Sequence, residues 1–360
     1  MALIKLESIA HSYYPNPEKD EDYALKSLDV DWSDGGAYAL LGPSGCGKTT
    51  LLNIISGLLT PSNGRVLYDG KDVTSLSPEQ RNIAQVFQFP VLYDTMTVFD
   101  NLAFPLRNRR AAKKIVDQRV LEIATMLDLE HDLKKKASGL SPDAKQKISL
   151  GRGLVRDDVA AILFDEPLTV IDPQLKWDLR RKLKEVHHRM KRTLVYVTHD
   201  QIEAMTFAEK VVVMYNGSVV QMGTPQELFE NPAHTFVGYF IGNPGMNFFD
   251  CHIDGKDAVI GKNRISLSHD LLGRVKKAEG DLKFGIRPLY LDLSSTPCDN
   301  CIKVEIASVN NLGAYKIVTA KMDKSMVKIN VPEDKEVTET KGWLHFPKEW
   351  IRIYSNEYLV

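Results

Sequence analysis

The stretch Gly42-Pro43-Ser44-Gly45-Cys46-Gly47-Lys48-Thr49-Thr50 decides the fold of this chain. It matches the pattern G-x-x-x-x-G-K-[ST], a loop that binds nucleotide phosphates. Its glycines let the backbone turn tightly and aim N–H groups at phosphate oxygens. Lys48 supplies a cation for the β- and γ-phosphates, the Thr49 hydroxyl can bind Mg²⁺, and the next helix offers its positive N-terminal end. We therefore predict that all nine residues line a nucleotide site.

The segments on either side of this loop agree with the pattern. Ala37 to Leu41 is short and apolar, which is typical of a buried strand. Beyond the loop, Leu52, Ile55 and Leu59 recur at helical spacing. Strand, loop and helix thus follow in the order that the pattern requires, and this favours nucleotide binding over a chance match in a glycine-rich turn.

Length and charge limit the possible functions. The chain has 360 residues and a net charge of −1, so we expect two domains and find no argument for nucleic acid as a partner. No apolar run approaches the roughly 18 residues of a membrane span. The N-terminus lacks the apolar core of a signal peptide. We expect a soluble, cytoplasmic protein that reaches a membrane only through partners.

The chain contains four cysteines. Cys298 and Cys301 form a single C-x-x-C, and a zinc site would need two further ligands. We interpret this pair as two unrelated thiols in a loop, in preference to a metal or redox site.

Apolar strands alternate with helices through the first two thirds of the chain. The segments 160–164 and 194–197 are typical of strands buried in parallel sheets, and the amphipathic segment 175–186 between them is typical of a helix. The alternation predicts a doubly wound α/β fold. Residues 3–9 and 25–32 are expected to form an antiparallel edge, and residues from about 90 to 158 a helical insertion.

Polar side chains follow three of the predicted strands, namely Gln88, Asp165-Glu166 and His199. In doubly wound sheets the ligand lies beyond the carboxyl ends of the strands. Asp165 is suited to hold Mg²⁺, and Glu166 to orient or deprotonate a water. Gln88 can bind the metal or that water, and His199 can hydrogen-bond the γ-phosphate. Each alone is typical of a structural cap, but together with the phosphate loop they favour ATP hydrolysis.

The character of the sequence changes after Asn243-Pro244-Gly245. Ile302, Val304 and Ile306 alternate with polar residues, and turn residues recur at short intervals. This pattern predicts a small all-β module, a sandwich or barrel. We expect one domain over residues 1–240 and a second over 241–360.

With these motifs the chain resembles ATP-binding-cassette (ABC) ATPases of the carbohydrate-importer branch, the maltose and glycerol-phosphate type. The matching segments are Walker A (Gly42–Thr50), the Q-loop glutamine Gln88, Walker B with its catalytic glutamate (Ile162–Pro167), the switch-histidine segment (Thr198–Met205), and two C-terminal segments (Gly242–Phe248 and Gly285–Pro288). The resemblance implies a P-loop ATPase core followed by an OB-like (TOBE-type) regulatory domain. Taken alone, Tyr13 is typical of a half-buried sheet tyrosine, but the resemblance implies that it stacks on adenine.

Two segments depart from the family pattern. The signature is Leu-Ser-Gly-Gly-Gln in the family, and this chain has Leu140-Ser141-Pro142-Asp143-Ala144. Pro142 has no N–H to donate, and Asp143 places a carboxylate near the phosphate held by the second subunit. In the loop Leu168–Asp172, where the family usually has Ser-Asn-Leu-Asp, only Asp172 of the D-loop matches cleanly. We therefore expect a heterodimer with a different ATPase that carries an intact signature, in preference to a homodimer that tolerates the altered one.

The resemblance implies that the chain uses ATP and Mg²⁺ to power an importer of a sugar, polyol or glycerol-type solute. It implies two membrane permeases as partners, a solute-binding protein, and a peripheral position at the cytoplasmic face of the membrane. Val91, Tyr93 and Met96 are the candidates for permease contact.

The alternative is a subunit that binds ATP as a structural latch and hydrolyses little. An ABC ATPase acting on DNA or translation is disfavoured, because the chain has no long coiled coil or second cassette.

Overall fold

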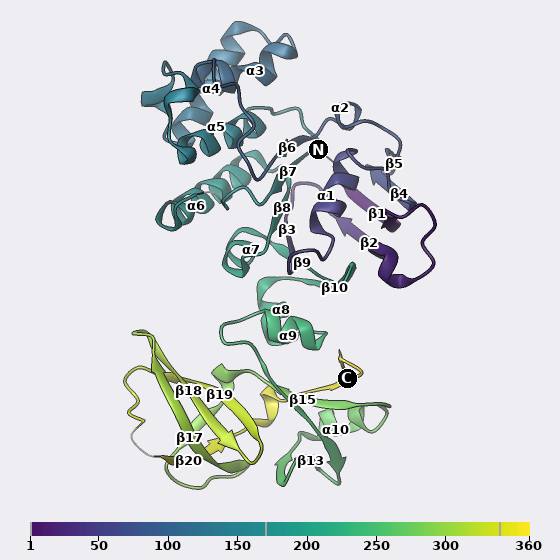
Figure 1. Ribbon diagram of the computed structural model, residues 1–360, viewed down its shortest axis with the longest axis vertical. Coiled ribbons are helices and arrows are strands. Elements are labelled where there is room, and N and C mark those ends of the chain that lie inside the picture. The colour runs from purple at the N-terminus through teal and green to yellow at the C-terminus, as the bar shows by residue number, and fades with distance from the viewer. Residues whose placement is uncertain (1, 170, 338–339) are drawn as a thin grey trace. The chain divides into compact units, whose positions relative to one another are not determined.

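The computed structural model describes residues 2–169, 171–337 and 340–360. The chain forms two compact units, Met1–Pro225 and Gln226–Val360 (Figure 1). The second unit begins earlier than the predicted residue 241, and α8 (Pro225–Glu230) and α9 (Thr235–Phe240) explain why. The buried guanidinium of Arg287 donates hydrogen bonds to four carbonyl oxygens in or beside these two helices, which ties them to the β-rich part of the chain.

A six-stranded sheet lies at the centre of the first unit, in the order β10-β9-β3-β8-β7-β6. All pairs are parallel except β10 with β9. The α/β prediction is therefore confirmed. The strands are β3 (Ala37–Leu41), β6 (Ala84–Val86), β7 (Ala161–Asp165), β8 (Thr193–Thr198), β9 (Lys210–Tyr215) and β10 (Ser218–Gly223). β3 and β8 are buried along their whole length, including the threonines at both ends of β8, as expected for central strands of a parallel sheet.

A second, antiparallel sheet has the order β2-β1-β4-β5. It comprises β1 (Ile4–Ser12), β2 (Tyr23–Trp32), β4 (Asn63–Tyr68) and β5 (Lys71–Asp72). The predicted antiparallel edge is confirmed, since β1 pairs with β2 from Ile4↔Trp32 to Ser12↔Tyr23. Helix α1 (Lys48–Ser56) contacts both β2 and the parallel strands β7 and β8, so its apolar side chains join the cores of the two sheets.

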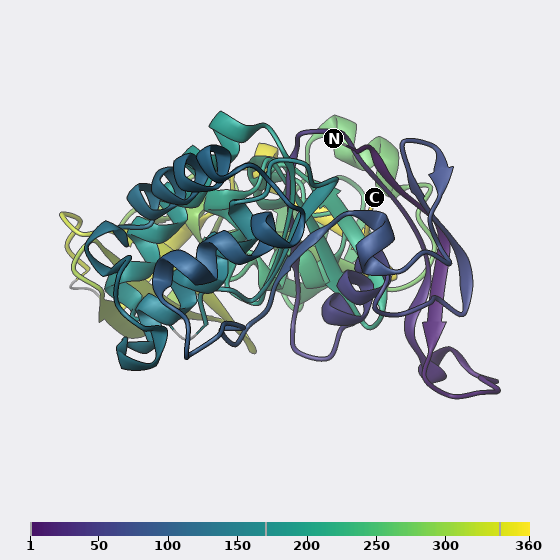
Figure 2. The same cartoon turned by 90° about the horizontal axis from the view of Figure 1, so that it is seen from above.

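Three helices lie between β6 and β7 in the chain, where the sequence predicts a helical insertion. They are α3 (Val98–Asn108), α4 (Lys113–Met126) and α5 (Pro142–Leu154). Figure 2 shows these blue helices and the purple strands β1 and β2 on opposite sides of the first unit. The remaining helices of this unit are α2 (Pro78–Arg81), α6 (Pro173–Met190) and α7 (Gln201–Phe207).

The second unit is built mainly from antiparallel strands in three sheets, with the orders β11-β15-β21-β22, β12-β13-β14 and β16-β20-β17-β18-β19. Its elements are β11 (Asn247–Asp250), β12 (His252–Asp254), β13 (Asp257–Ile260), β14 (Asn263–Ser266), α10 (His269–Val275), β15 (Leu282–Ile286), β16 (Asp292–Ser294), β17 (Cys301–Asn311), β18 (Tyr315–Met322), β19 (Ser325–Pro332), β20 (Lys341–His345), β21 (Arg352–Ser355) and β22 (Tyr358–Leu359). The sheets share one apolar core. The predicted all-β character is confirmed, apart from the short helices.

The interpretation of Cys298 and Cys301 as unrelated thiols is wrong, because the structure joins their sulfurs in a disulfide. A spacing of two residues lets a tight turn bring both side chains to the same side, and sequence alone could not show that this turn forms here. Among the described residues, no helix combines the length and apolar character needed to cross a membrane.

Candidate active site

The phosphate loop connects β3 to α1 and is shaped by its glycines. Gly47 has φ +101°, and a Cβ there would lie 2.7 Å from the carbonyl oxygen of Ala24. A Cβ on Gly42 would lie 2.3 Å from the carbonyl oxygen of Met214. Lys48 begins α1, and its Nζ donates to the carbonyl oxygens of Gly42 (2.8 Å) and Pro43 (2.9 Å). The loop therefore holds the ammonium group beside the backbone N–H groups at the start of α1.

Thr49 and Asp165 bring the phosphate loop and the end of β7 together. The Thr49 hydroxyl donates to Asp165 Oδ1 at 3.5 Å, across 116 residues of sequence. Burial raises the pKa of the Asp165 carboxyl, and the neighbouring carboxylate of Glu166 raises it further. The charge of Lys48 and the Thr49 hydrogen bond partly offset this rise, and the pair brings two oxygen donors together beside the phosphate loop.

Glu166 and His199 meet at the carboxyl ends of β7 and β8. His199 Nδ1 lies 3.2 Å from Glu166 Oε2, and the Thr169 hydroxyl donates to the same oxygen at 3.3 Å. Glu166 has φ +45°, a left-handed conformation that is costly for a residue with a Cβ, and its N–H bonds the carbonyl oxygen of Val197 at 3.0 Å. Strained backbone held by its surroundings is a recurrent feature of active sites. Sequence reasoning missed Thr169, whose hydroxyl was the only available signal.

Two more predicted residues flank this centre. Tyr13 follows β1 and is 64% exposed rather than half-buried. Its hydroxyl lies 3.1 Å from Thr50 Oγ1, so its exposed ring stands next to the phosphate loop. Gln88 follows β6 at the same edge of the sheet and is partly exposed. The next strand, β7, ends at Asp165, so the predicted strand-end residues come from neighbouring parallel strands.

The altered signature segment starts α5 with ordinary helix-capping chemistry. Ser141 is the N-cap, and its hydroxyl accepts the Ala144 N–H at 3.3 Å. Pro142 occupies the first helical position, where a backbone N–H would have no partner inside the helix. The Asp143 carboxylate accepts the Asp172 N–H at 3.4 Å, and the Asp172 carboxylate caps α6 by accepting the Gln174 N–H at 2.9 Å. Within the D-loop segment, Val170 lies outside the described residues.

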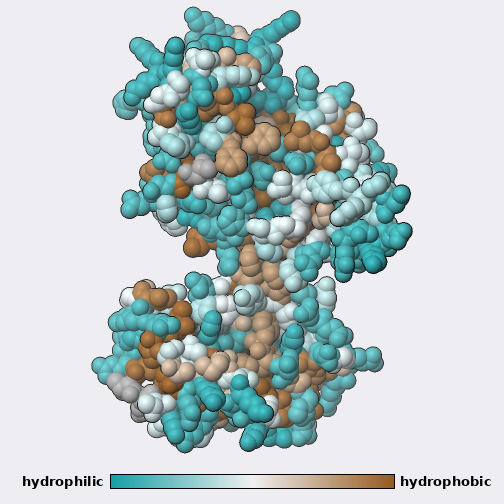
Figure 3. Space-filling model, viewed as in Figure 1, coloured by the Kyte–Doolittle hydropathy of each residue, from teal (hydrophilic) through white to brown (hydrophobic). Residues whose placement is uncertain are grey.

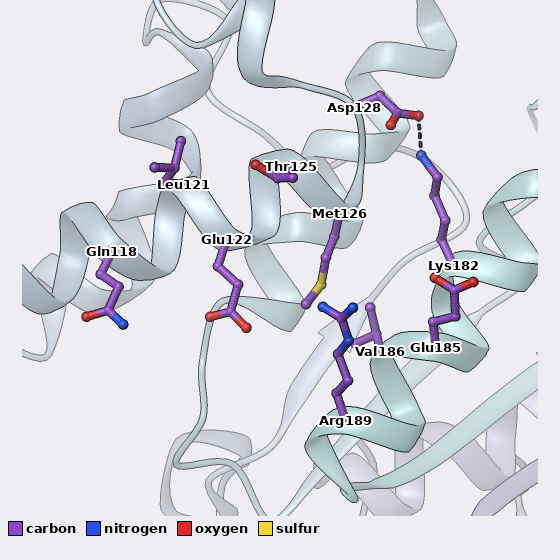
Figure 4. A pocket seen from close by; sticks show the side chains of 10 residues that line it. All are labelled: Gln118, Leu121, Glu122, Thr125, Met126, Asp128, Lys182, Glu185, Val186 and Arg189. Atoms are coloured by element: carbon purple, nitrogen blue, oxygen red, sulfur yellow. Dashed lines mark hydrogen bonds and ion pairs between the residues drawn. The ribbon is translucent and has the colours of Figure 1, made fainter.

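A separate cavity of about 520 Å³ lies between α4 and α6 (Figure 4). Asp128 pairs there with Lys182, and the thioether of Met126 faces Arg189. The remaining lining residues are Gln118, Leu121, Glu122, Thr125, Glu185 and Val186. None of the predicted site residues lines this cavity, so it is distinct from the phosphate-loop site.

Comparison with known proteins decides the family. The family model for the ABC transporter matches residues 25–169. The sn-glycerol-3-phosphate import ATP-binding protein UgpC of Psychromonas ingrahamii is 38% identical over 322 residues, which are 89% of this chain and 83% of that protein. This chain belongs to the ABC transporter family. It is the ATP-binding and ATP-hydrolysing subunit of an importer, as the resemblance implies.

Other members of the ABC family agree. The trehalose/maltose import ATP-binding protein MalK of Thermococcus litoralis is 40% identical over 310 residues, which are 82% of this chain and 83% of that protein. Among solved structures, cbiO1 of Clostridium perfringens matches with a TM-score of 0.58 and 27% identity, over 64% of this chain and 91% of that one. The ATP-binding cassette MJ0796, bound to ADP and Pi, matches with a TM-score of 0.54 and 29% identity, over 61% of this chain and 98% of that one.

The expectation of a different ATPase as partner is wrong. Import ATPases of the UgpC and MalK type, which this ABC ATPase matches over most of its length, are typically homodimeric. That expectation rested on Pro142 and Asp143 of the signature segment, and their effect on a phosphate held by a second subunit stays a prediction. In the structure, Pro142 stands where a helix has no need of its N–H, and the Asp143 carboxylate bonds within its own chain.

Proposed function

We propose that this ABC ATPase powers the uptake of a sugar, polyol or glycerol-type solute. The UgpC proteins of Salmonella typhimurium and Escherichia coli are relatives with this specificity. Each matches 99% of this chain, so the similarity extends over both units. The observation that carries the catalytic assignment is the meeting of Glu166 and His199 at 3.2 Å beside the phosphate loop. The proposal assigns each of these residues a role in hydrolysis of ATP to ADP and phosphate.

In this proposal the phosphates of ATP bind over the start of α1. Backbone N–H groups of residues 42–50 bind phosphate oxygens, and Lys48 turns its ammonium from the loop carbonyls toward the β- and γ-phosphates. The exposed ring of Tyr13 stacks on the adenine. Its hydroxyl contact with Thr50 supports this role, because it holds the ring at the edge of the phosphate loop.

Mg²⁺ fits the residues present. The Thr49 hydroxyl and the Asp165 carboxylate are oxygen donors of the type that Mg²⁺ prefers, and they already lie 3.5 Å apart. Burial and the Glu166 carboxylate raise the pKa of Asp165, and a bound cation would favour its charged form. Thr49, Asp165 and the amide of Gln88 would hold the ion, which would supply charge neutralisation at the phosphate oxygens.

Glu166 is proposed to orient the attacking water and to accept its proton. The Thr169 hydroxyl and His199 Nδ1 both contact Glu166 Oε2, so they fix the carboxylate in one orientation. His199 is 54% exposed and can therefore also reach a bound γ-phosphate by hydrogen bonding. The signature segment Leu140–Ala144 of the second copy would close the site over this phosphate.

The same proposal places the permease contact beside the helical insertion. Apolar side chains gather at the surface of the first unit there (Figure 3). The exposed ones after Gln88 are Phe89 (68%), Val91 (53%) and Tyr93 (42%), while Met96 is partly buried. Arg152 of α5 supports them, donating to the Val91 carbonyl at 2.8 Å and stacking on the Tyr93 ring. Docking to permeases here would hold the ATPase at the cytoplasmic face of the membrane.

Replacement of the proposed general base tests the catalytic assignment. Glu166→Gln keeps the shape of the side chain but cannot accept the proton, so we expect the kcat for ATP to fall by about 100-fold or more. Binding of a fluorescent ATP analogue should be unchanged. The matched control is Glu185→Gln, an exposed glutamate on α6 outside the site. Normal turnover by Glu166→Gln would contradict the assignment.

A further inference from the structure

Gln146 is a fully buried polar side chain on α5, two residues after the signature segment Leu140–Ala144. Its Nε2 donates to the carbonyl oxygen of Pro167 at 2.7 Å and also approaches that of Phe87 at 3.4 Å. Pro167 directly follows Glu166, and Phe87 directly precedes Gln88. One amide group therefore touches the backbone next to both proposed site residues.

The rest of α5 reinforces this connection. The signature segment that it begins contacts the D-loop through Asp143 and Asp172, as described above. Further along, the Ser149 hydroxyl accepts the Val91 N–H at 3.4 Å. Of these contacts, only the Gln146 hydrogen bond joins α5 to Pro167, the residue after Glu166. A shift of α5 would therefore move the Pro167 carbonyl through a single hydrogen bond.

The oxygen atom of the Gln146 amide, Oε1, has unusual surroundings. In the described part of the chain, Gln146 Oε1 is buried without a hydrogen-bond partner. Buried polar atoms are normally paired, because an unpaired one costs free energy. An apolar residue here would avoid this cost but leave the Pro167 carbonyl unpaired. The unpaired oxygen also leaves the amide able to accept a donor if α5 changes position.

We propose that Gln146 is a positioning residue that couples the signature segment to the catalytic loop of the same subunit. When the signature segment contacts the nucleotide of the second copy, α5 shifts, and Gln146 passes the shift to the backbone beside Glu166 and Gln88. Each subunit then hydrolyses its own ATP in response to the nucleotide of the other. This inference rests on the proposed function, in which Glu166 is the base and the signature closes the opposite site.

The test compares Gln146→Met with Lys147→Met in the full-length chain. Lys147 neighbours Gln146 on α5, but its Nζ pairs with Asp128 at 3.7 Å, away from Pro167 and Phe87 in the sequence. We expect Gln146→Met to lower kcat by about tenfold while the Kd for a fluorescent ATP analogue stays within about twofold. The inference requires a wild-type Hill coefficient for ATP above 1, because each site responds to the other, and this coefficient should fall to 1 in Gln146→Met. Lys147→Met should keep the wild-type values of all three.

Further variants separate the possible outcomes. Gln146→Asn, one methylene shorter, gives the same test if the methionine variant does not fold, since its amide cannot reach the Pro167 carbonyl. Wild-type kcat and Hill coefficient in a folded variant would overturn the inference, as would losses of kcat and ATP affinity in equal proportion. Glu166→Gln is measured in parallel: if it is inactive while the Gln146 variants behave normally, only the coupling role fails. If Glu166→Gln is active, the proposed function fails.

Discussion

Two adjacent carboxylates at the end of β7 differ in their surroundings. Asp165 faces the phosphate loop, where burial raises the pKa of its carboxyl group. Glu166 turns the other way through its left-handed backbone conformation and bonds Thr169 and His199. The change of backbone direction between them lets one residue face the proposed metal position and the other the proposed water position.

The raised pKa of Asp165 gives a stability prediction with a definite sign. A folded-state pKa above the unfolded value means that the charged carboxylate is disfavoured by folding, so stability is lost as pH rises through the folded pKa. Asp165→Asn removes this charge. Without nucleotide or Mg²⁺, the variant should melt at a higher temperature than the wild type at pH 7.5, and the difference should vanish below about pH 4. Thermal melts across pH measure this, and a lower melting temperature at pH 7.5 would contradict it.

The removal of the Asp165 carboxylate should have the opposite effect on activity. If this oxygen holds Mg²⁺, Asp165→Asn should lower ATP turnover by at least about 100-fold, because charge on the phosphates is no longer neutralised in the right place. Initial rates over a range of Mg²⁺ concentrations measure this. Recovery of full turnover at high Mg²⁺ would show that Asp165 affects only the affinity for the ion, and undiminished turnover at low Mg²⁺ would exclude a role.

At the scale of elements, a buried carboxylate holds the end of β8, next to the loop that carries His199. Glu203 of α7 is 4% exposed, and its Oε2 accepts hydrogen bonds from the hydroxyls of Tyr196 (3.1 Å) and Thr198 (2.8 Å). Its Oε1 lies 3.7 Å from Lys176 Nζ of α6. Two helices and the end of β8 thus meet at one side chain directly under the His199 loop.

This network predicts the effect of Glu203→Gln. The amide keeps the shape but loses the charge that faces Lys176, and a weakened buried network costs about 1–3 kcal/mol in free energy of unfolding. Because the His199 loop loosens, we expect kcat for ATP to fall several-fold with ATP binding unchanged. Urea denaturation and steady-state kinetics measure the two effects. Glu185→Gln serves as the exposed control, and equal behaviour of the two variants would contradict the prediction.

The elements show how far sequence alone can predict this structure. The strand, loop and helix around Lys48 have strong local signals. A parallel sheet brings strand ends together by its own geometry, so the position of Asp165, Glu166 and His199 at one edge of the sheet could be predicted. Gln146 and Glu203 could not, because their roles depend on which backbone lies across the helix in space. The partner was predicted wrongly for a related reason, because the altered signature segment alone does not show which chain faces it. The position of Pro142 as the first residue of α5 became visible only in the structure.

At the scale of the whole molecule, the proposed site is completed by two subunits. The phosphate loop of one subunit is closed by the signature segment of the other. The homologous import ATPases are typically homodimers, and in the proposed arrangement a second copy of this chain supplies the signature segment. Ser141 keeps its hydroxyl at the start of α5 and is exposed, as contact with a second copy requires. The Asp143 carboxylate accepts the Asp172 N–H of the same chain, which joins the signature to the D-loop of the same copy.

This arrangement predicts that ATP drives self-association when hydrolysis is blocked. The chain has a mass of 40.5 kDa, so a homodimer has 2 × 40.5 = 81 kDa. Glu166→Gln with ATP and Mg²⁺ should show this mass by light scattering, and the monomer mass without nucleotide. Adding Ser141→Arg should abolish the dimer but not ATP binding, because a bulky cation at the N-cap blocks approach of the second copy and removes the cap. A monomer under all conditions would contradict closure by a second copy, because the nucleotide would then have no second subunit to close over it.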